Sequence, residues 1–365
     1  MFVIIIHRYM SKMKRILPLF LVLTFLISCK NIFSVKNSDS GSVPIQRIDS
    51  TDLTNNFYDN VETVSLPLTE VTIEGEISNP GIVDFKKLTK HSVIVKEALL
   101  DELGGNKFVG AYRYDGYSLL DILDQSRIIK SNAKEFQPII DLYVEIENAV
   151  GQKIIFSWGE IYYPNKLHSI ILATNVARIV PSKTKDLWTL PSECKIVSGN
   201  DLVTERNISN PVKITVKSYP KSFNVEKGLS PMYSDGFTIF NEKKELTKIV
   251  QIPSGLNINT YNTIFYGRGK GIHSTTPFKG VLLKSLLEKY FPYTRESLTT
   301  GLFCLVGKDG YRMTVSYSEM MNRNDQQEFL LIKTLENEDG GLFRIFPSSD
   351  FFSDRAIKSL AEIHF

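Results

Sequence analysis

The strongest constraint on this chain is an internal repeat. Residues 195–216 align with residues 344–365 at a constant offset of 149 residues and without a gap. Identical residues recur along the alignment in the pairs Ile196/Ile345, Asp201/Asp350, Arg206/Arg355, Ile208/Ile357 and Ile214/Ile363. Self-similarity at a fixed spacing indicates that one structural unit occurs twice. The chain of 365 residues is therefore expected to contain two copies of one domain.

The two copies also match in the sequence that precedes this segment. Residues 142–160 and 303–319 each read as an alternating strand, a glycine, a second strand and a Ser-x-x-Glu tetrad. Before them, residues 114–117 and 278–281 each predict a glycine turn that enters a short helix, because apolar residues follow at helical spacing. Since strands outnumber helices, the pattern predicts the α+β class, with two tandem, mostly antiparallel β domains and short helices.

The N-terminus is typical of an export signal. Residues 1–29 contain four basic residues and no acidic one, and an apolar run from Ile16 to Ile27 follows. A run of about 12 residues is too short to span a hydrocarbon core of about 30 Å, so it indicates a signal peptide. The run ends in Ser28-Cys29, which resembles the lipobox of bacterial lipoproteins and implies that Cys29 carries lipid, including palmitate. A plain signal peptide with an incidental cysteine is the alternative.

The expected organisation has five parts. Residues 1–28 are the signal peptide, and residues 29–66 are a lipidated flexible tether, because they are rich in Ser, Asn, Asp and Thr. The first domain spans 67–217, a linker spans 218–232, and the second domain spans 233–365. Such a protein is expected to be exported and lipid-anchored to the cell envelope, at the outer membrane or the cell surface.

The charge of the chain excludes a nucleic-acid partner. The full sequence has 43 basic and 40 acidic residues, a formal net charge of +3. Removal of residues 1–28 removes four basic residues and leaves 39 basic and 40 acidic ones, a net charge of −1. The sequence also lacks a cluster of Lys and Arg interleaved with aromatic residues, which single-strand binding requires.

Three blocks of the second copy resemble a known family. They are Phe278–Leu283, Asp309-Gly310-Tyr311, and Gly340–Pro347 with the closing strand that follows. Their order and spacing resemble the molybdopterin-binding domain of sulfite-oxidase-type oxidoreductases, and the first copy carries weaker versions of the first and last blocks. The resemblance implies a sulfite-oxidase-like molybdopterin-binding fold in both copies.

The chain departs from this family at the metal ligand. In the family, a cysteine on the loop after the second strand binds molybdenum. Its thiolate is a soft ligand, which suits that metal site. Neither equivalent segment, 92–105 or 262–274, contains a cysteine, and Cys194 and Cys304 lie in other blocks. Both domains are therefore expected to be degenerate, with no metal site and no catalytic residue assigned.

A glycine-rich basic loop occupies the place of the missing cysteine loop in the second copy. Glycines let backbone N–H groups approach an anion, and basic side chains add charge. The candidate anion- or pterin-binding residues are Gly267, Arg268, Gly269, Lys270, Gly271 and His273. The alternative is a surface loop that is basic by chance.

Other polar residues are expected to be structural. The repeated pairs Asp201/Arg206 and Asp350/Arg355 are interpreted as salt bridges or caps, because both copies need the fold while the chemistry is rarely needed twice. His91 and His168 have no neighbour in the sequence at the spacing of metal ligands.

The sequence thus predicts an envelope lipoprotein with a non-catalytic binding or scaffold role. No cofactor is expected. Its partners are the membrane, reached through the lipid anchor, and an unknown small ligand or envelope protein. One alternative is a molybdopterin-dependent oxidoreductase, and another is a lipoprotein that binds a small anion or solute.

Overall fold

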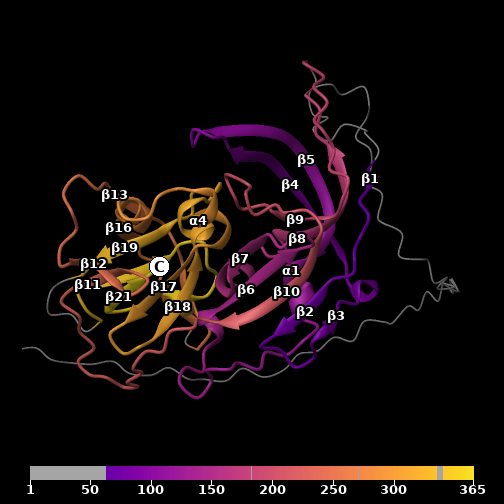
Figure 1. Cartoon of the computed structure of the whole chain (residues 1–365). Coiled ribbons are helices and arrows are strands. Elements are labelled where there is room, and N and C mark those ends of the chain that lie inside the picture. The colour runs from indigo at the N-terminus through magenta and orange to yellow at the C-terminus, as the bar shows by residue number, and fades with distance from the viewer. Residues whose placement is uncertain (1–62, 182, 270, 335–339) are drawn as a thin grey trace, which may run out of the picture. The chain divides into compact units, whose positions relative to one another are not determined.

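The computed structural model describes residues 63–365, except 182, 270 and 335–339 (Figure 1). The expected signal peptide, Cys29 and nearly all of the expected tether lie outside the described residues. The described residues belong to one compact unit. Within its described part, no helix has the length and apolar character needed to cross a membrane.

The first half of the unit contributes two sheets. The order β1-β8-β5-β4, with β9 added beside β8, makes one sheet, and β3-β2-β10-β6-β7 makes the other. The strands of the first sheet are β1 (Val64–Ser65), β4 (Lys90–Leu100), β5 (Asn106–Ser118), β8 (Ile170–Arg178) and β9 (Lys195–Ser198). Those of the second are β2 (Thr72–Gly75), β3 (Gly81–Ile82), β6 (Leu142–Asn148), β7 (Lys153–Ser157) and β10 (Pro211–Ser218).

The second half contributes two further sheets and a hairpin, shown in orange and yellow in Figure 1. The sheet β12-β11-β21-β17-β18 consists of β11 (Phe237–Asn241), β12 (Lys244–Ile249), β17 (Leu302–Gly307), β18 (Arg312–Ser316) and β21 (Leu360–His364). The sheet β13-β16-β19-β20 consists of β13 (Ile258–Tyr261), β16 (Phe278–Leu282), β19 (Phe329–Lys333) and β20 (Phe343–Pro347). The hairpin pairs β14 (Phe265–Gly267) with β15 (Gly271–Ser274).

The helices that the structure describes are about one turn long. The α-helices are α1 (Leu119–Leu123), α2 (Trp158–Tyr162), α3 (Leu283–Leu287), α4 (Arg295–Thr300) and α5 (Tyr317–Met321). The 3-10 helices are η1 (Phe85–Lys87), η2 (Ile139–Asp141) and η3 (Ser353–Arg355). Helices this short are not stable alone, so their apolar faces must be held by the sheets.

The expected fold class is wrong. The chain is mostly β, and its four main sheets are arranged as a four-bladed β-propeller, not as two tandem sulfite-oxidase-like domains of the α+β class. The apolar spacing after residues 118 and 282 does form helices, but α1 and α3 have only five residues each. Short blocks such as Asp309-Gly310-Tyr311 are compatible with many β arrangements, so the resemblance did not specify the fold.

The sequence repeat does recur in the strand pairing. Strand β10 pairs in parallel with β2 and antiparallel with β6. Strand β21 pairs in the same way with β11 and β17. The repeated residues Ile214 and Ile363 lie at corresponding places on β10 and β21, and both are buried. The alignment at an offset of 149 residues thus marks equivalent strands of the two halves.

The glycine turn expected at residues 114–117 is also wrong. Gly116 lies inside β5, at a bulge in the pairing with β8. A Cβ atom at this position would lie 2.1 Å from the carbonyl oxygen of Leu172 on β8. Glycine is therefore required by the close approach of two strands and not by a chain reversal.

Candidate functional site

The candidate loop at residues 267–271 is the tip of the β14–β15 hairpin. Gly267 pairs with Gly271 across the turn. Gly271 has a φ of +71°, a left-handed conformation that glycine adopts without strain. Gly269 has open space around it, and Lys270 lies outside the described residues. The expected loop is therefore the turn of a hairpin, and Gly271 serves the reversal of the chain.

Arg268 is engaged by the protein itself. Its Nε lies 3.0 Å and its Nη2 lies 2.5 Å from Oδ1 of Asp354, which belongs to η3. The guanidinium also lies over the ring of Phe352, 5.8 Å from its centroid. These contacts hold Arg268 against the η3 segment, so its charge is already neutralised by a carboxylate.

His273 lies beside the backbone of the same hairpin. A Cβ atom at position 267 would lie 2.4 Å from Nε2 of His273, so the absence of a side chain at Gly267 makes room for the imidazole. The ring of Phe265 is 5.5 Å from the ring of His273. The described candidate residues therefore belong to one hairpin, in which Arg268 and His273 both lie next to protein groups.

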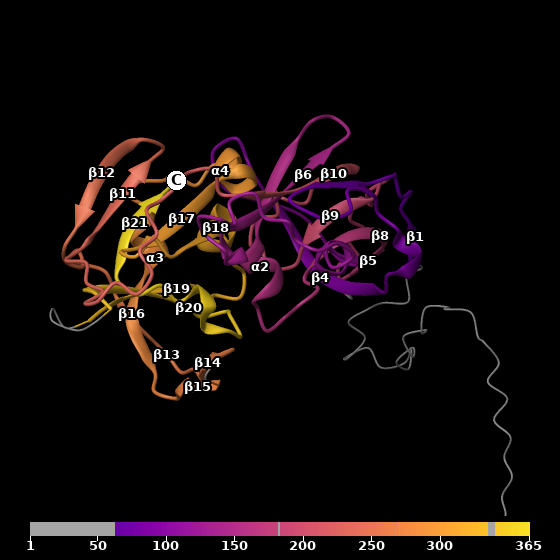
Figure 2. The ribbon, with the colours of Figure 1, turned by 90° about the horizontal axis from the view of Figure 1, so that it is seen from below.

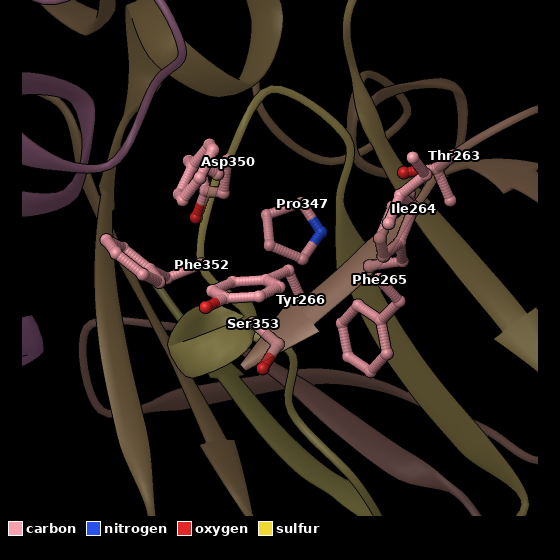
Figure 3. A pocket seen from close by; sticks show the side chains of 10 residues that line it. Thr263, Ile264, Phe265, Tyr266, Pro347, Asp350, Phe352 and Ser353 are labelled. Carbon is pink, nitrogen blue, oxygen red and sulfur yellow. The ribbon is translucent and has the colours of Figure 1, made fainter. Parts of the chain in front are cut away.

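A small hollow lies between this hairpin and the segment before η3 (Figure 3). Aromatic and apolar residues line most of it, including Phe265, Tyr266, Pro347 and Phe352. Its empty volume is about 210 Å³, part of which is open to solvent. The enclosed part has room for about 10 Å³, whereas pockets that bury a drug-sized ligand have about 300–1,000 Å³, so the hollow is too small for a pterin cofactor.

The two cysteines within the described residues do not fit the role of a molybdenum ligand. Cys194 and Cys304 are free and fully buried. Burial raises the pKa of the Cys304 thiol well above its usual range, which keeps the sulfur protonated. A neutral thiol inside β17 cannot act as the thiolate ligand that the family resemblance requires.

The repeated acid–base pairs form the ion pairs that the sequence predicts. The Arg206 guanidinium binds Asp201 through Nε at 2.8 Å and through Nη2 at 2.6 Å. Arg355 binds Asp350 in the same bidentate way, with both distances 2.7 Å. All four residues are buried. The structural interpretation of these pairs is confirmed.

These ion pairs extend into a buried junction between the two halves. Ser157 and Ser316 cap the N-termini of α2 and α5, and the third residue of each helix, Glu160 or Glu319, pairs with the arginine of its own half. Two further hydrogen bonds connect the halves. Arg206 of the first half donates to Ser316 Oγ of the second at 3.1 Å, and Ser157 of the first half donates to Glu319 of the second at 2.6 Å. Figure 2 shows α2 beside β18, where the halves meet.

Burial gives Glu160 an unusual protonation equilibrium. Desolvation raises the pKa of the Glu160 carboxyl, and neighbouring Glu319 raises it further, while Arg206 opposes both. The native state therefore binds a proton that the unfolded chain releases at pH about 4.5. Stability derived from this proton is present in acid and is lost as the pH rises through the native pKa.

A Glu160→Gln variant tests this linkage. Because glutamine cannot release a proton, the free energy of unfolding of the variant should improve relative to the wild type as the pH rises above 4.5. Urea denaturation across a pH series measures the difference. Glu145→Gln is the opposite control: burial opposes its ionisation, but hydrogen bonds from Lys217 and Lys153 outweigh burial and lower the pKa of Glu145. A pH-independent difference for Glu160→Gln would contradict the assignment.

One group of side chains has no counterpart in the sequence expectations. His91, Asp121 and His168 lie together although they come from β4, α1 and the loop before β8. They are separated by 30 and 47 residues in the sequence, so no motif spacing connects them. Only the antiparallel pairing of β4, β5 and β8 brings their segments to one place.

The hairpin with its aromatic hollow and the buried junction are the two features that the candidate residues build. No model of a known protein family matches the chain, and no curated protein matches it.

Proposed function

We propose that this chain is a lipid-anchored envelope protein with a non-catalytic binding or scaffold role. The observation that carries the proposal is the burial of the repeated acid–base pairs Asp201/Arg206 and Asp350/Arg355. Catalytic acids and bases must reach a substrate, whereas these groups are sealed inside the protein and bound to one another. Their position supports a role in building a rigid body.

The β14–β15 hairpin supports the binding part of the proposal. Ile264, Tyr266, Ile272 and Phe351 expose apolar side chains around it, with Ile272 65% and Phe351 51% exposed. Tyr266 lies 5.7 Å from Phe351 between ring centroids and pairs with Ile272 across the hairpin, and Ile264 lines the same hollow, so the four residues are neighbours. We name these four residues the hairpin surface. An apolar surface next to a small hollow is typical of a site for a partner's side chain.

The anchoring part is tested at Cys29. The wild-type chain, expressed in a bacterium with lipoprotein processing, should incorporate a palmitate analogue and partition into detergent. A Cys29→Ser variant should do neither, while Ser38→Ala should behave like the wild type. Equal labelling of Cys29→Ser and the wild type would contradict lipidation at this residue.

The binding part is tested by cross-linking in intact cells. A photoreactive phenylalanine analogue in place of Tyr266 should form a discrete adduct with an envelope component. The same analogue in place of Val150 is the control, because Val150 is 86% exposed in the turn between β6 and β7. The absence of an adduct at Tyr266, or the same adduct at both positions, would exclude binding at the hairpin surface.

The non-catalytic part is tested by metal analysis of the purified full chain. We expect molybdenum far below one atom per chain and no released pterin fluorescence. Stoichiometric molybdenum would contradict the proposal and would support an oxidoreductase.

A further inference from the structure

We propose that His91, Asp121 and His168 form a binding site for one divalent transition-metal ion, with Zn²⁺ as the representative ion. Each residue offers one ligand atom, and these atoms all lie within 4.8 Å of one another. The site lies in the first half, on residues that the hairpin surface and the junction do not include.

The carboxylate lies between the two imidazoles. Nε2 of His91 lies 2.8 Å from Oδ2 of Asp121, and Nδ1 of His168 lies 3.6 Å from Oδ1 of the same carboxylate. The imidazole rings are stacked, with centroids 3.9 Å apart and planes 5° from parallel. The donor atoms therefore lie close together, and at least one ring must turn out of the stack for both lone pairs to point at one ion.

The separations are close to those of bound ligands. Nitrogen and oxygen ligands lie about 2.0–2.2 Å from Zn²⁺, so two ligands of a tetrahedral site are roughly 3.4 Å apart. The present separations of up to 4.8 Å exceed this by about 1.4 Å at most, a distance within the reach of side-chain rotation. His91 and Asp121 lie on β4 and α1, which are regular elements.

The backbone of His168 has an unusual conformation. Its φ is +61°, in the left-handed region that is uncommon for residues other than glycine. The next residue is fixed on both sides, because Gly199 N donates to Ser169 O at 2.8 Å and Asn200 Nδ2 donates to Ser169 Oγ at 2.8 Å. Backbone conformations of this kind occur often at ligand sites, where the surrounding structure holds them.

His168 also has an unsatisfied ring nitrogen. Its Nδ1 is buried and makes no hydrogen bond within the described part of the chain. A buried polar atom without a partner is costly, and a metal ion would satisfy it through the lone pair of the neutral imidazole. The unsatisfied atom is the one that faces Asp121.

The donor set selects the kind of ion. Two imidazole nitrogens and one carboxylate oxygen suit Zn²⁺ and neighbouring first-row ions, whereas Mg²⁺ and Ca²⁺ prefer oxygen ligands alone. The three side chains are between 24% and 32% exposed, so an ion can enter from solvent. Three protein ligands leave a fourth position for water or for a group of a partner.

The site is tested by titrating Zn²⁺ into the purified full chain in detergent against a chromogenic chelator. We expect one Zn²⁺ per chain. His91→Ala and His168→Ala should each weaken binding by at least about tenfold, since even the loss of a supporting residue has that effect. His273→Ala is the matched control and should leave the affinity unchanged, because His273 lies on the β14–β15 hairpin.

A second readout separates a metal site from a structural hydrogen bond between His91 and Asp121. Zn²⁺ should raise the melting temperature of the wild type and of His273→Ala, but not that of His168→Ala. Co²⁺ is a second probe, because a Co²⁺ ion held by few ligands absorbs visible light. Co²⁺ added to the wild type should give this absorption, and Co²⁺ added to His168→Ala should not. Equal Zn²⁺ affinity in the wild type and a His91→Ala/His168→Ala double variant would overturn the proposal. None of these outcomes bears on the cross-linking or molybdenum results.

Discussion

Replacing Arg355 by methionine is expected to lower the free energy of unfolding by about 3–5 kcal/mol. Methionine fills much of the same volume but leaves Asp350 and Glu319 buried without their cation. Arg355 is fully buried, and its Nη2 lies 2.7 Å from a carboxylate oxygen of each partner. Urea denaturation at neutral pH, followed by tryptophan fluorescence, measures the loss.

Arg268→Met is the matched control for this variant. Arg268 also pairs with an aspartate, but its side chain is 57% exposed. Pairs of this kind contribute about 0–1 kcal/mol, so the control should lose no more than that. A double variant Arg355→Met/Asp350→Asn should recover part of the loss, because it removes one of the unpaired charges. If Arg355→Met and Arg268→Met lose equal amounts of the free energy of unfolding, the buried carboxylates of the junction do not depend on Arg355.

Replacing Arg312 by methionine is expected to cost a similar amount, about 3–5 kcal/mol. Arg312 lies on β18 and is fully buried, and its Nε lies 3.1 Å from Asp141 on η2 of the other half. Its Nη1 lies 2.9 Å from Glu135. Asp141 keeps a second partner, Lys130 at 2.6 Å, so the loss should fall toward the lower end of the range.

The position of Arg312 between the halves gives this variant a second expected result. Amide hydrogens of η2 and β18 should exchange faster in Arg312→Met than in the wild type, while those at the pairing of β4 with β5 should not change. Lys153→Met is the control, because Lys153 pairs with Glu145 at the surface with 45% of its side chain exposed. Unchanged exchange at η2 would contradict a role of Arg312 in joining the halves.

The sequence predicted the repeated ion pairs better than it predicted the fold. A repeated Asp and Arg five residues apart predict an ion pair, which depends on few neighbours. The arrangement of the sheets depends on contacts between distant strands. Gly116 illustrates the difference, because its role is set by Leu172 on another strand and not by its own neighbours in the chain.

The candidate sites show the same limit. The glycines at 267 and 271 correctly located a turn, but the ion pair of Arg268 with Asp354 joins residues 86 positions apart. His91 and His168 carried no recognisable spacing, since their meeting depends on the register of β4, β5 and β8. A residue type alone could identify them as possible ligands, but only the sheet makes them neighbours.

The crossed contacts at the junction have a consequence for the origin of the chain. Ser157 of the first half bonds Glu319 of the second, and Arg206 of the first half bonds Ser316 of the second. Both contacts lie at the N-termini of the equivalent helices α2 and α5, so the same element of each half takes part. A single copy of the repeat would present the same helix N-terminus to a second copy. Fusion into one chain makes that pairing independent of protein concentration and lets the two halves diverge while they stay associated.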